Sequence, residues 1–232
     1  QLLIETAKRC NRRLQVGHEY YLYPAIREAR KVLDAGEIGT PLMIKSELYS
    51  YIYNLLGTWW MDPEKAKGGP AINMAVHVVD IASFLLGRNP LAVRGESREL
   101  HPEAVAGIED YFRMELDFGN NLFTDCRIYS FVRNCDNLKA ALTVLGEKGC
   151  LSVWSNTLEV QAAGATKSEL RYKGDVSKGY LIFAEQLKQF VEYIEEDIKP
   201  RADGEFGKMT VSCIEGAIKS GYANTDNWVK IS

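Results

Sequence analysis

The segment 67–80 contains residue types that can carry out acid–base chemistry. It reads Lys-Gly-Gly-Pro-Ala-Ile-Asn-Met-Ala-Val-His-Val-Val-Asp, with two glycines ahead of an apolar run. Asn73 and His77 are four residues apart, so on a helix they lie on one face, one turn apart, and Asp80 is close to that face. An imidazole titrates near neutral pH and can exchange a proton. An Asn side chain can only orient a hydroxyl or a carbonyl by hydrogen bonding.

A structural role for the same residues stays open. A buried helix can carry a His and an Asn that are satisfied by backbone groups, with Asp80 holding the imidazole in place. The paired glycines and the second polar residue on the same face favour a site, because buried polar groups are costly unless they are paired. We therefore take His77 as a candidate general acid–base group and Asn73 as its orienting neighbour.

The bulk composition narrows the class of protein. The chain has 232 residues, with a formal net charge of −3 at pH 7 and a pI of about 5.8. This length fits one large domain or two small ones. No run of Lys and Arg stands out, and no apolar run reaches the length of a membrane span. We therefore expect neither nucleic acid nor a membrane as a partner.

Cysteine usage indicates the compartment. The five cysteines are scattered and odd in number: Cys10, Cys126, Cys135, Cys150 and Cys213. None belongs to a Cys-x-x-Cys pair, which is typical of reduced thiols in a cytoplasmic protein. A metal site would need help from His18, His77 or His101, and no ligand spacing indicates one. We expect a cytoplasmic protein with no metal.

The apolar periodicity predicts helices on either side of a block of strands. Helical spacing covers 2–10, 24–35, 71–86, 180–198 and a last helix capped by Asp203. Strand patterns cover 13–17, 42–53, 92–100, 109–118, 121–131, 138–145, 150–154, 157–162 and 228–231. Turns at 117–121 and 147–149 join consecutive strands. This order indicates the α+β class, with an open, mainly antiparallel β-sheet and helices on one face.

These elements and motifs, taken in order, resemble the C-terminal domain of the Gfo/Idh/MocA family. Its members are NAD(P)-dependent oxidoreductases that act on sugars, inositols and related polyols. The resemblance rests on Val-Gly-His-Glu-Tyr-Tyr at 16–21, Pro-Ala-Ile at 24–26, Gly-Glu-Ile-Gly at 36–39, the segment 68–80, Leu-Asp-Phe-Gly-Asn at 116–120 and Leu-Gly-Glu-Lys-Gly at 145–149. It implies a dihydrodipicolinate-reductase-like α/β domain, in agreement with the fold that the periodicity predicts.

The resemblance also implies a parent protein with two domains. The chain contains neither the Gly-x-Gly-x-x-Gly fingerprint of a Rossmann domain nor the family's Glu-Lys-Pro motif, whose lysine takes part in catalysis. We expect residues 1–15 to be the end of the nucleotide-binding domain and residues 16–232 to be the substrate-binding and oligomerisation domain. The missing N-terminal domain would bind most of the NAD or NADP. The chain alone is therefore expected to be inactive.

The family's chemistry assigns roles to the polar helix. In the family, hydride passes between a substrate carbinol carbon and the nicotinamide, while the protein orients the substrate and handles the proton. The resemblance places His77 on the family's catalytic His. It places Asn73 where many members have Asp and some have Asn. Lys67 stands where a third glycine is common.

Aromatic side chains near the expected cleft are candidates for binding a sugar ring, because amphipathic rings stack on such ligands. They are Tyr20, Tyr21, Trp59 and Trp60. Ordinary packing in the core or at a domain interface stays open for all four. Tyr21 occupies a position where family members often carry Arg.

One face of the expected sheet carries charged and aromatic side chains: Tyr111, Arg113, Glu115, Arg127 and Tyr129. Such a face is usually solvated, yet in the family it often packs against a second subunit. We expect a homodimer or homotetramer formed through this face.

Three functional hypotheses remain. The leading one is the substrate-binding and oligomerisation domain of an NAD(P)-dependent dehydrogenase for a sugar, inositol or related polyol. The second is a non-catalytic dimerisation or ligand-binding module of the same fold, which Asn73 motivates because it lacks a carboxylate. The third is glycosidase-type chemistry that uses NAD transiently.

Overall fold

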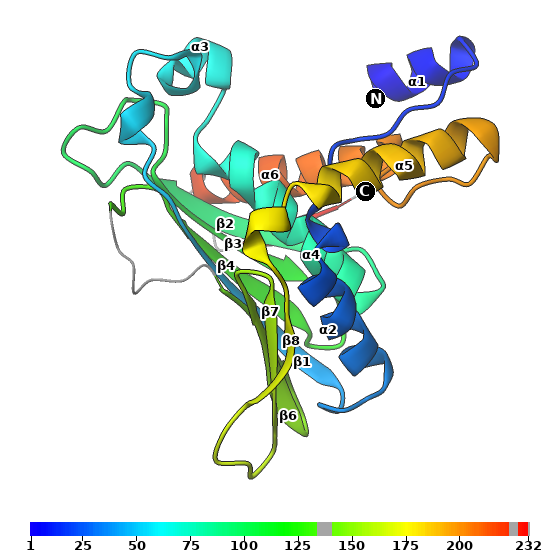
Figure 1. The fold of residues 1–232 in the computed structure, drawn as a ribbon. Coiled ribbons are helices and arrows are strands. Elements are labelled where there is room, and N and C mark those ends of the chain that lie inside the picture. The colour runs from blue at the N-terminus through cyan, green and yellow to red at the C-terminus, as the bar shows by residue number, and fades with distance from the viewer. Residues whose placement is uncertain (134–140, 223–226, 232) are drawn as a thin grey trace.

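An open β-sheet with helices against one of its faces forms the frame of the molecule (Figure 1). The computed structural model describes residues 1–133, 141–222 and 227–231. The strands are β1 (Pro41–Tyr49), β2 (Ala92–Arg98), β3 (Tyr111–Asp117), β4 (Phe123–Tyr129), β5 (Ala141–Gly146), β6 (Gly149–Trp154), β7 (Thr157–Ala162), β8 (Glu169–Lys173) and β9 (Val229–Lys230). The α-helices are α1 (Leu2–Arg9), α2 (Pro24–Asp34), α3 (Pro63–Ala66), α4 (Val76–Leu86), α5 (Leu181–Glu195) and α6 (Gly204–Tyr222).

Short helical turns connect some of these elements. Four are 3-10 turns: η1 (Tyr20–Leu22), η2 (Tyr53–Leu55), η3 (Trp59–Met61) and η5 (Val176–Lys178). The fifth, η4 (Ala71–Ala75), is a π turn that leads directly into α4.

Within the described residues the sheet has nine strands in the order β8-β7-β6-β5-β1-β4-β3-β2-β9. Strand β1 joins two halves of the sheet, because it pairs antiparallel with β5 on one side and parallel with β4 on the other. The other strand pairs are antiparallel. The predicted α+β class and mainly antiparallel open sheet are therefore confirmed, with one parallel pair at the centre.

Alternation along the strands separates a core face from an open face. On β3, Phe112, Met114 and Leu116 are fully buried, while Tyr111 and Arg113 point to the opposite side. The buried side chains pack under α2, α4 and α6 in one apolar cluster. Each such side chain contributes about 1.5–3 kcal/mol when it leaves water. The core thus holds α4, and the site on it, firmly against the sheet.

One helical stretch, Pro63–Leu86, is long and apolar enough to cross a membrane by length and composition, which the sequence did not lead us to expect. It comprises α3, η4 and α4, and half of its most apolar window is buried inside the fold. Core helices pass the same test of length and composition. Its apolar character is accounted for by the burial of α4 in the core cluster, where it packs next to α2 and α6.

The structure differs from the predicted elements in three places. Residues 13–17 form no strand, and Gln15 makes only an isolated bridge to Asp203. Strand β8 was not predicted, because most of its side chains are exposed and no apolar alternation marks it. The predicted helix at 71 begins with a π turn. The expected strand 138–145 begins in residues that lie outside the described part of the chain, as does Cys135.

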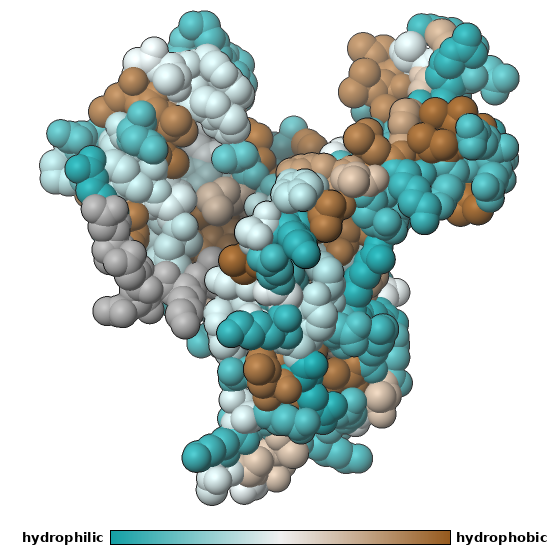
Figure 2. All heavy atoms as spheres, in the orientation of Figure 1, coloured by the Kyte–Doolittle hydropathy of each residue, from teal (hydrophilic) through white to brown (hydrophobic). Residues whose placement is uncertain are grey.

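Apolar side chains gather on the arm formed by α1 and α5, which Figure 2 shows in brown at the upper right. Leu2 and Leu3 on α1 are exposed, as are Phe183, Leu187 and Val191 on α5. The surface between this arm and the α3 region is hollowed (Figures 1 and 2).

Candidate functional site

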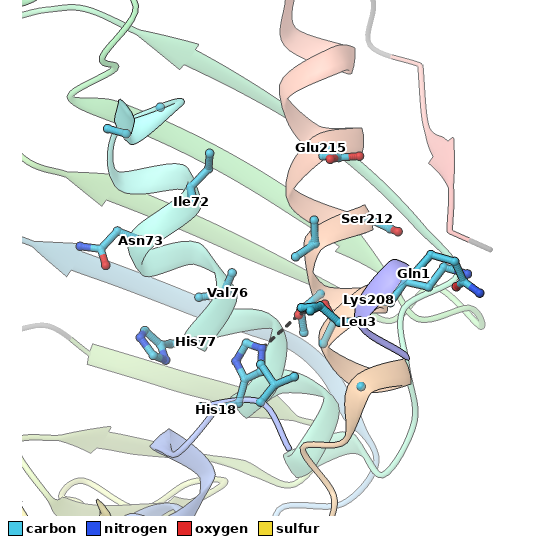
Figure 3. A pocket seen from close by; sticks show the side chains of 18 of the residues that line it. Gln1, Leu3, His18, Ile72, Asn73, Val76, His77, Lys208, Ser212 and Glu215 are labelled. Atoms are coloured by element: carbon cyan, nitrogen blue, oxygen red, sulfur yellow. Dashed lines mark hydrogen bonds between the residues drawn. The ribbon is translucent and has the colours of Figure 1, made fainter. Parts of the chain in front are cut away.

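Three cavities meet at the helical segment that carries Asn73 and His77. The largest, of about 780 Å³, lies between this segment and α6 and reaches α1 (Figure 3). A second, of about 330 Å³, lies between α4, η1 and strands β1, β5 and β6. A third, of about 230 Å³, is bounded by η2 and the Gly68–Gly69 loop. Asn73 lines the first and the third, and His77 lines the first and the second.

The loop before the helix places Asn73 at the cavity wall. Lys67 ends α3 with a φ of 59°, a left-handed conformation that glycine adopts more readily than other residues. Asn73 lies in the π turn and is exposed, whereas His77 lies on the first turn of α4 and is half-buried. A single π turn at the start of a helix often marks a functional site. As the spacing predicts, both side chains point to the same side of the helix (Figure 3).

The imidazole of His77 is packed between two other rings. The Tyr20 ring stacks on it with centroids 3.8 Å apart and planes 10° apart. The His18 ring meets it edge to face at 6.4 Å. Burial, and to a lesser degree the proximity of His18, lowers the pKa of His77 to about 4. His77 is therefore neutral at pH 7, the form in which an imidazole can accept a proton.

Asp80 does not hold the imidazole, contrary to the structural alternative raised for this helix. It is fully buried and pairs with Arg201, whose Nε lies 3.5 Å from its Oδ1. Arg201 also donates from Nη2 to the Asp80 carbonyl oxygen at 3.2 Å. Burial raises the pKa of Asp80 to about 6, against the opposing effect of Arg201. Asp80 thus ties α4 to the segment before α6.

His18 is a site residue for which the sequence predicted no catalytic or binding role. It is buried against the largest cavity, and its Nε2 lies 3.1 Å from Oγ1 of Thr210. The Thr210 hydroxyl donates its single proton to the Gly207 carbonyl at 2.8 Å, so the His18 Nε2 must be the donor to Thr210. Burial, followed by the charge of Arg201, lowers the pKa of His18 to about 4. His18 and His77 are 59 positions apart in the sequence, so local spacing could not predict that their rings meet.

The structure brings three of the four aromatic candidates to the cleft. Tyr20 stacks on His77, as described. Trp59 and Trp60 stack on each other at 4.3 Å and stand exposed at the rim of the largest cavity. Tyr21 lies elsewhere: it is buried, its hydroxyl donates to Gln189 Oε1 at 2.7 Å, and it lines none of the three cavities.

The site offers surface for one end of a cofactor. Ile72, Val76 and Val211 give the largest cavity an apolar wall beside Asn73 and His77. Such a wall fits a flat aromatic group like a nicotinamide ring. Among the described residues, no group of three or more His, Cys, Asp or Glu side chains is placed to hold a metal ion.

The opposite face of the sheet carries the predicted row of charged residues, linked across β2, β3 and β4. Arg94 pairs with Glu115 at 2.6 Å, and Glu115 also pairs with Arg113. Arg113 reaches Asp125 at 3.4 Å, and Asp125 pairs with Arg127 at 3.1 Å. The rings of Tyr49 and Tyr129 stack at the edge of this network. The ion pairs satisfy the charges within the sheet.

Comparisons with known proteins identify the family and the fold of the chain. A model of the GFO/IDH/MocA C-terminal domain matches residues 26–152, more than half of the chain. D-xylose 1-dehydrogenase (NADP(+)) of Haloarcula marismortui is 22% identical over 238 residues, covering 99% of this chain and 63% of that protein. Inositol 2-dehydrogenase of Rhizobium meliloti is 22% identical over 212 residues, covering 90% of this chain and 62% of that protein.

A solved structure with a similar fold is the aldose-aldose oxidoreductase of Caulobacter crescentus, in complex with glycerol. Its TM-score is 0.81 at 20% identity, over 98% of this chain and 67% of that one. The chain thus spans about three fifths of the length of the curated relatives it matches.

Proposed function

The chain belongs to the GFO/IDH/MocA family of oxidoreductases through its C-terminal domain, and on that premise we propose that it provides the substrate side of an NAD(P)-dependent dehydrogenase. The substrate class we propose is a sugar, an inositol or a related polyol. The observation that carries the proposal is the joint placement of Asn73 and a neutral His77 at the meeting point of three cavities. Two relatives are named dehydrogenases of xylose and inositol, in agreement with this class.

In this proposal His77 is the general base. Oxidation of a carbinol releases a proton from the substrate hydroxyl, and a neutral imidazole can accept it. The nicotinamide, when bound, accepts the hydride from the carbinol carbon. Asn73 donates and accepts hydrogen bonds and so orients the reacting hydroxyl. Tyr20 holds the imidazole plane, and the exposed Trp59–Trp60 pair offers a stacking surface to a sugar ring.

The nucleotide would be held mainly by a domain that this chain does not contain. We propose that residues 1–15 are the end of that domain and that residues 16–232 bind the substrate and form the oligomer. The apolar wall of Ile72, Val76 and Val211 would contact only the nicotinamide end. Residues 1–232 alone are then expected to reduce neither NAD nor NADP with any polyol.

The test uses the full-length protein with a panel of aldoses, inositols, uronates and glycosides. Formation of NADH or NADPH with one of the sugars or polyols is the expected result. Absence of turnover with the whole panel, together with binding of a sugar, would favour the non-catalytic binding module instead. Release of a free sugar from a glycoside without net cofactor reduction would indicate glycosidase-type chemistry.

A further inference from the structure

Glu109 lies beneath the loop that begins the Asn73 helix, immediately before β3. Its side chain is buried, and both carboxylate oxygens accept backbone hydrogen bonds. Gly69 N donates to Oε2 at 2.8 Å and Ala71 N donates to Oε1 at 2.9 Å. In the described part of the chain no Lys, Arg or His forms an ion pair with it. Burial of a carboxylate without a cation is unfavourable unless hydrogen bonds compensate for the lost hydration. Here both of these hydrogen bonds come from one loop.

The main chain of Glu109 also fixes this loop. A Cβ atom at Gly69 would lie 2.1 Å from the Glu109 carbonyl oxygen, so only glycine fits there. Gly69 is therefore held from two sides by one residue, through its amide and through close backbone contact.

The carboxylate acts on the end of the helix that carries Asn73. The first amides of a helix lack partners within it, and Glu109 takes the amide of Ala71, the first residue of the π turn. Asn73 follows two residues later, inside that turn. His77 belongs to α4, which the buried residues Val78 and Val79 hold in the core. Loss of the carboxylate should therefore displace Asn73 more than His77.

The next residue provides a matched comparison. Asp110 is also a buried carboxylate that accepts backbone amides, from Leu100 and His101 at 2.8 Å each. It further accepts the Tyr53 hydroxyl at 2.6 Å. These partners belong to the segment after β2 and to η2, so Asp110 stabilises the fold without touching the Asn73 turn.

We propose that Glu109 is a positioning residue, whose carboxylate fixes the π turn and thereby sets Asn73 against His77 for the substrate hydroxyl. The expected effect on kcat rests on the proposed function, whereas the effect of Glu109 on the π turn can be measured without it.

The test compares Glu109→Gln with Asp110→Asn and with Glu99→Gln, an exposed carboxylate, all in the full-length protein. A Gln side chain has one acceptor oxygen, so one of the two hydrogen bonds from the backbone amides is lost. We expect kcat to fall about tenfold or more in Glu109→Gln, with KM for the sugar changed less than about threefold, because small misplacements of orienting groups are costly. Asp110→Asn and Glu99→Gln should keep kcat within about twofold.

Amide hydrogen exchange gives the second readout. Exchange of residues 69–75 should become faster in Glu109→Gln and stay unchanged in the two controls. Glu109→Asp keeps the charge but shortens the reach, and it replaces Glu109→Gln under the same criteria if the latter does not fold.

Three results would overturn the role of Glu109. They are unchanged exchange at 69–75, unchanged kcat in an active enzyme, or an equal loss of kcat in Asp110→Asn. If the wild-type protein oxidises no sugar or polyol, the proposed function fails. The structural role of Glu109 is then tested by amide hydrogen exchange alone. Faster exchange confined to residues 69–75 in Glu109→Gln supports the proposal that Glu109 fixes the turn.

Discussion

The ring of Tyr20 lies flat on the imidazole of His77, with centroids 3.8 Å apart and planes 10° apart. The two residues come from different elements, because η1 supplies Tyr20 and α4 supplies His77. The stack shields one face of the imidazole from water, and burial is the main cause of its lowered pKa. It therefore links a packing contact to the protonation state that the proposed chemistry requires.

Removal of the Tyr20 ring should raise the pKa of His77. Tyr20→Ala opens one face of the imidazole to water, so the pKa should rise from about 4 towards the ordinary value of about 6.5. Tyr20→Phe keeps the stack and should keep the low pKa. The measurement is an NMR titration of the His77 ring in the full-length protein. A midpoint that is the same in Tyr20→Ala and wild type would contradict this account.

The activity should be insensitive to pH around neutrality. A general base works in its neutral form, and His77 takes up its proton only as the pH falls towards about 4. The acid limb of kcat/KM should therefore lie well below the ordinary histidine value of about 6.5. Initial rates across the acid range, at constant ionic strength, measure this limb. A limb near pH 6.5 would show that a different group, or a less buried His77, controls the reaction.

The helical face of the site could be predicted from sequence, whereas its surroundings could not. Spacing alone placed Asn73 and His77 on one side of a helix, because the periodicity of a helix is a local property of the sequence. The π turn has no sequence signal, since it depends on Glu109 from a segment far along the chain. The partnership of Asp80 with Arg201 is equally non-local, and local spacing favoured the imidazole instead.

The sheet likewise has features that the sequence predicted and features that it did not. Strands with a buried face were predicted from their alternation, and Asp203 was correctly expected to cap the last helix, where it accepts the Phe206 amide at 2.8 Å. Strand β8 was missed because it has no buried face to reveal it. The parallel pairing of β1 with β4 was also not predicted, because their partnership is decided by the core rather than by a turn.

Loss of Arg201 should destabilise the fold in a pH-dependent manner. Arg201→Met leaves the buried Asp80 without its cation, which should lower the free energy of unfolding by about 3–5 kcal/mol at pH 7. The pKa of Asp80, about 6, is above its unfolded value of about 3.9, and loss of Arg201 raises it further. A raised pKa means that Asp80 favours the folded state when protonated, at low pH, and that this contribution is lost as the pH rises.

The difference between Arg201→Met and wild type should therefore shrink as the pH falls from about 7 to about 4, where Asp80 is protonated in both. Urea unfolding at several pH values measures it. Arg171→Met is a matched control that breaks only the partly exposed ion pairs with Glu37 and Glu169, each worth about 1 kcal/mol or less. A pH-independent difference for Arg201→Met would contradict the assignment to Asp80.

The open face of the sheet should mediate self-association. Tyr129 lies on this face and stacks on Tyr49, next to a network whose charges are already paired. Tyr129→Asp adds an unpaired charge to the proposed interface and should shift the oligomer towards monomer. Sedimentation velocity of the full-length protein measures the shift. Glu28→Lys, on the outer surface of α2, is the control and should leave the oligomer intact. An oligomer that survives Tyr129→Asp unchanged would place the interface elsewhere.

The most direct test of the proposed function is the steady-state rate of polyol oxidation by full-length His77→Ala, compared with wild type and His101→Ala. If His77 is the general base, kcat/KM should fall by about 10²–10⁴-fold in His77→Ala and stay within about twofold in His101→Ala. Sugar binding should persist, because the cavity walls remain. Turnover by His77→Ala at the wild-type rate would contradict the account and leave the Asn73–His77 helix with a purely structural role.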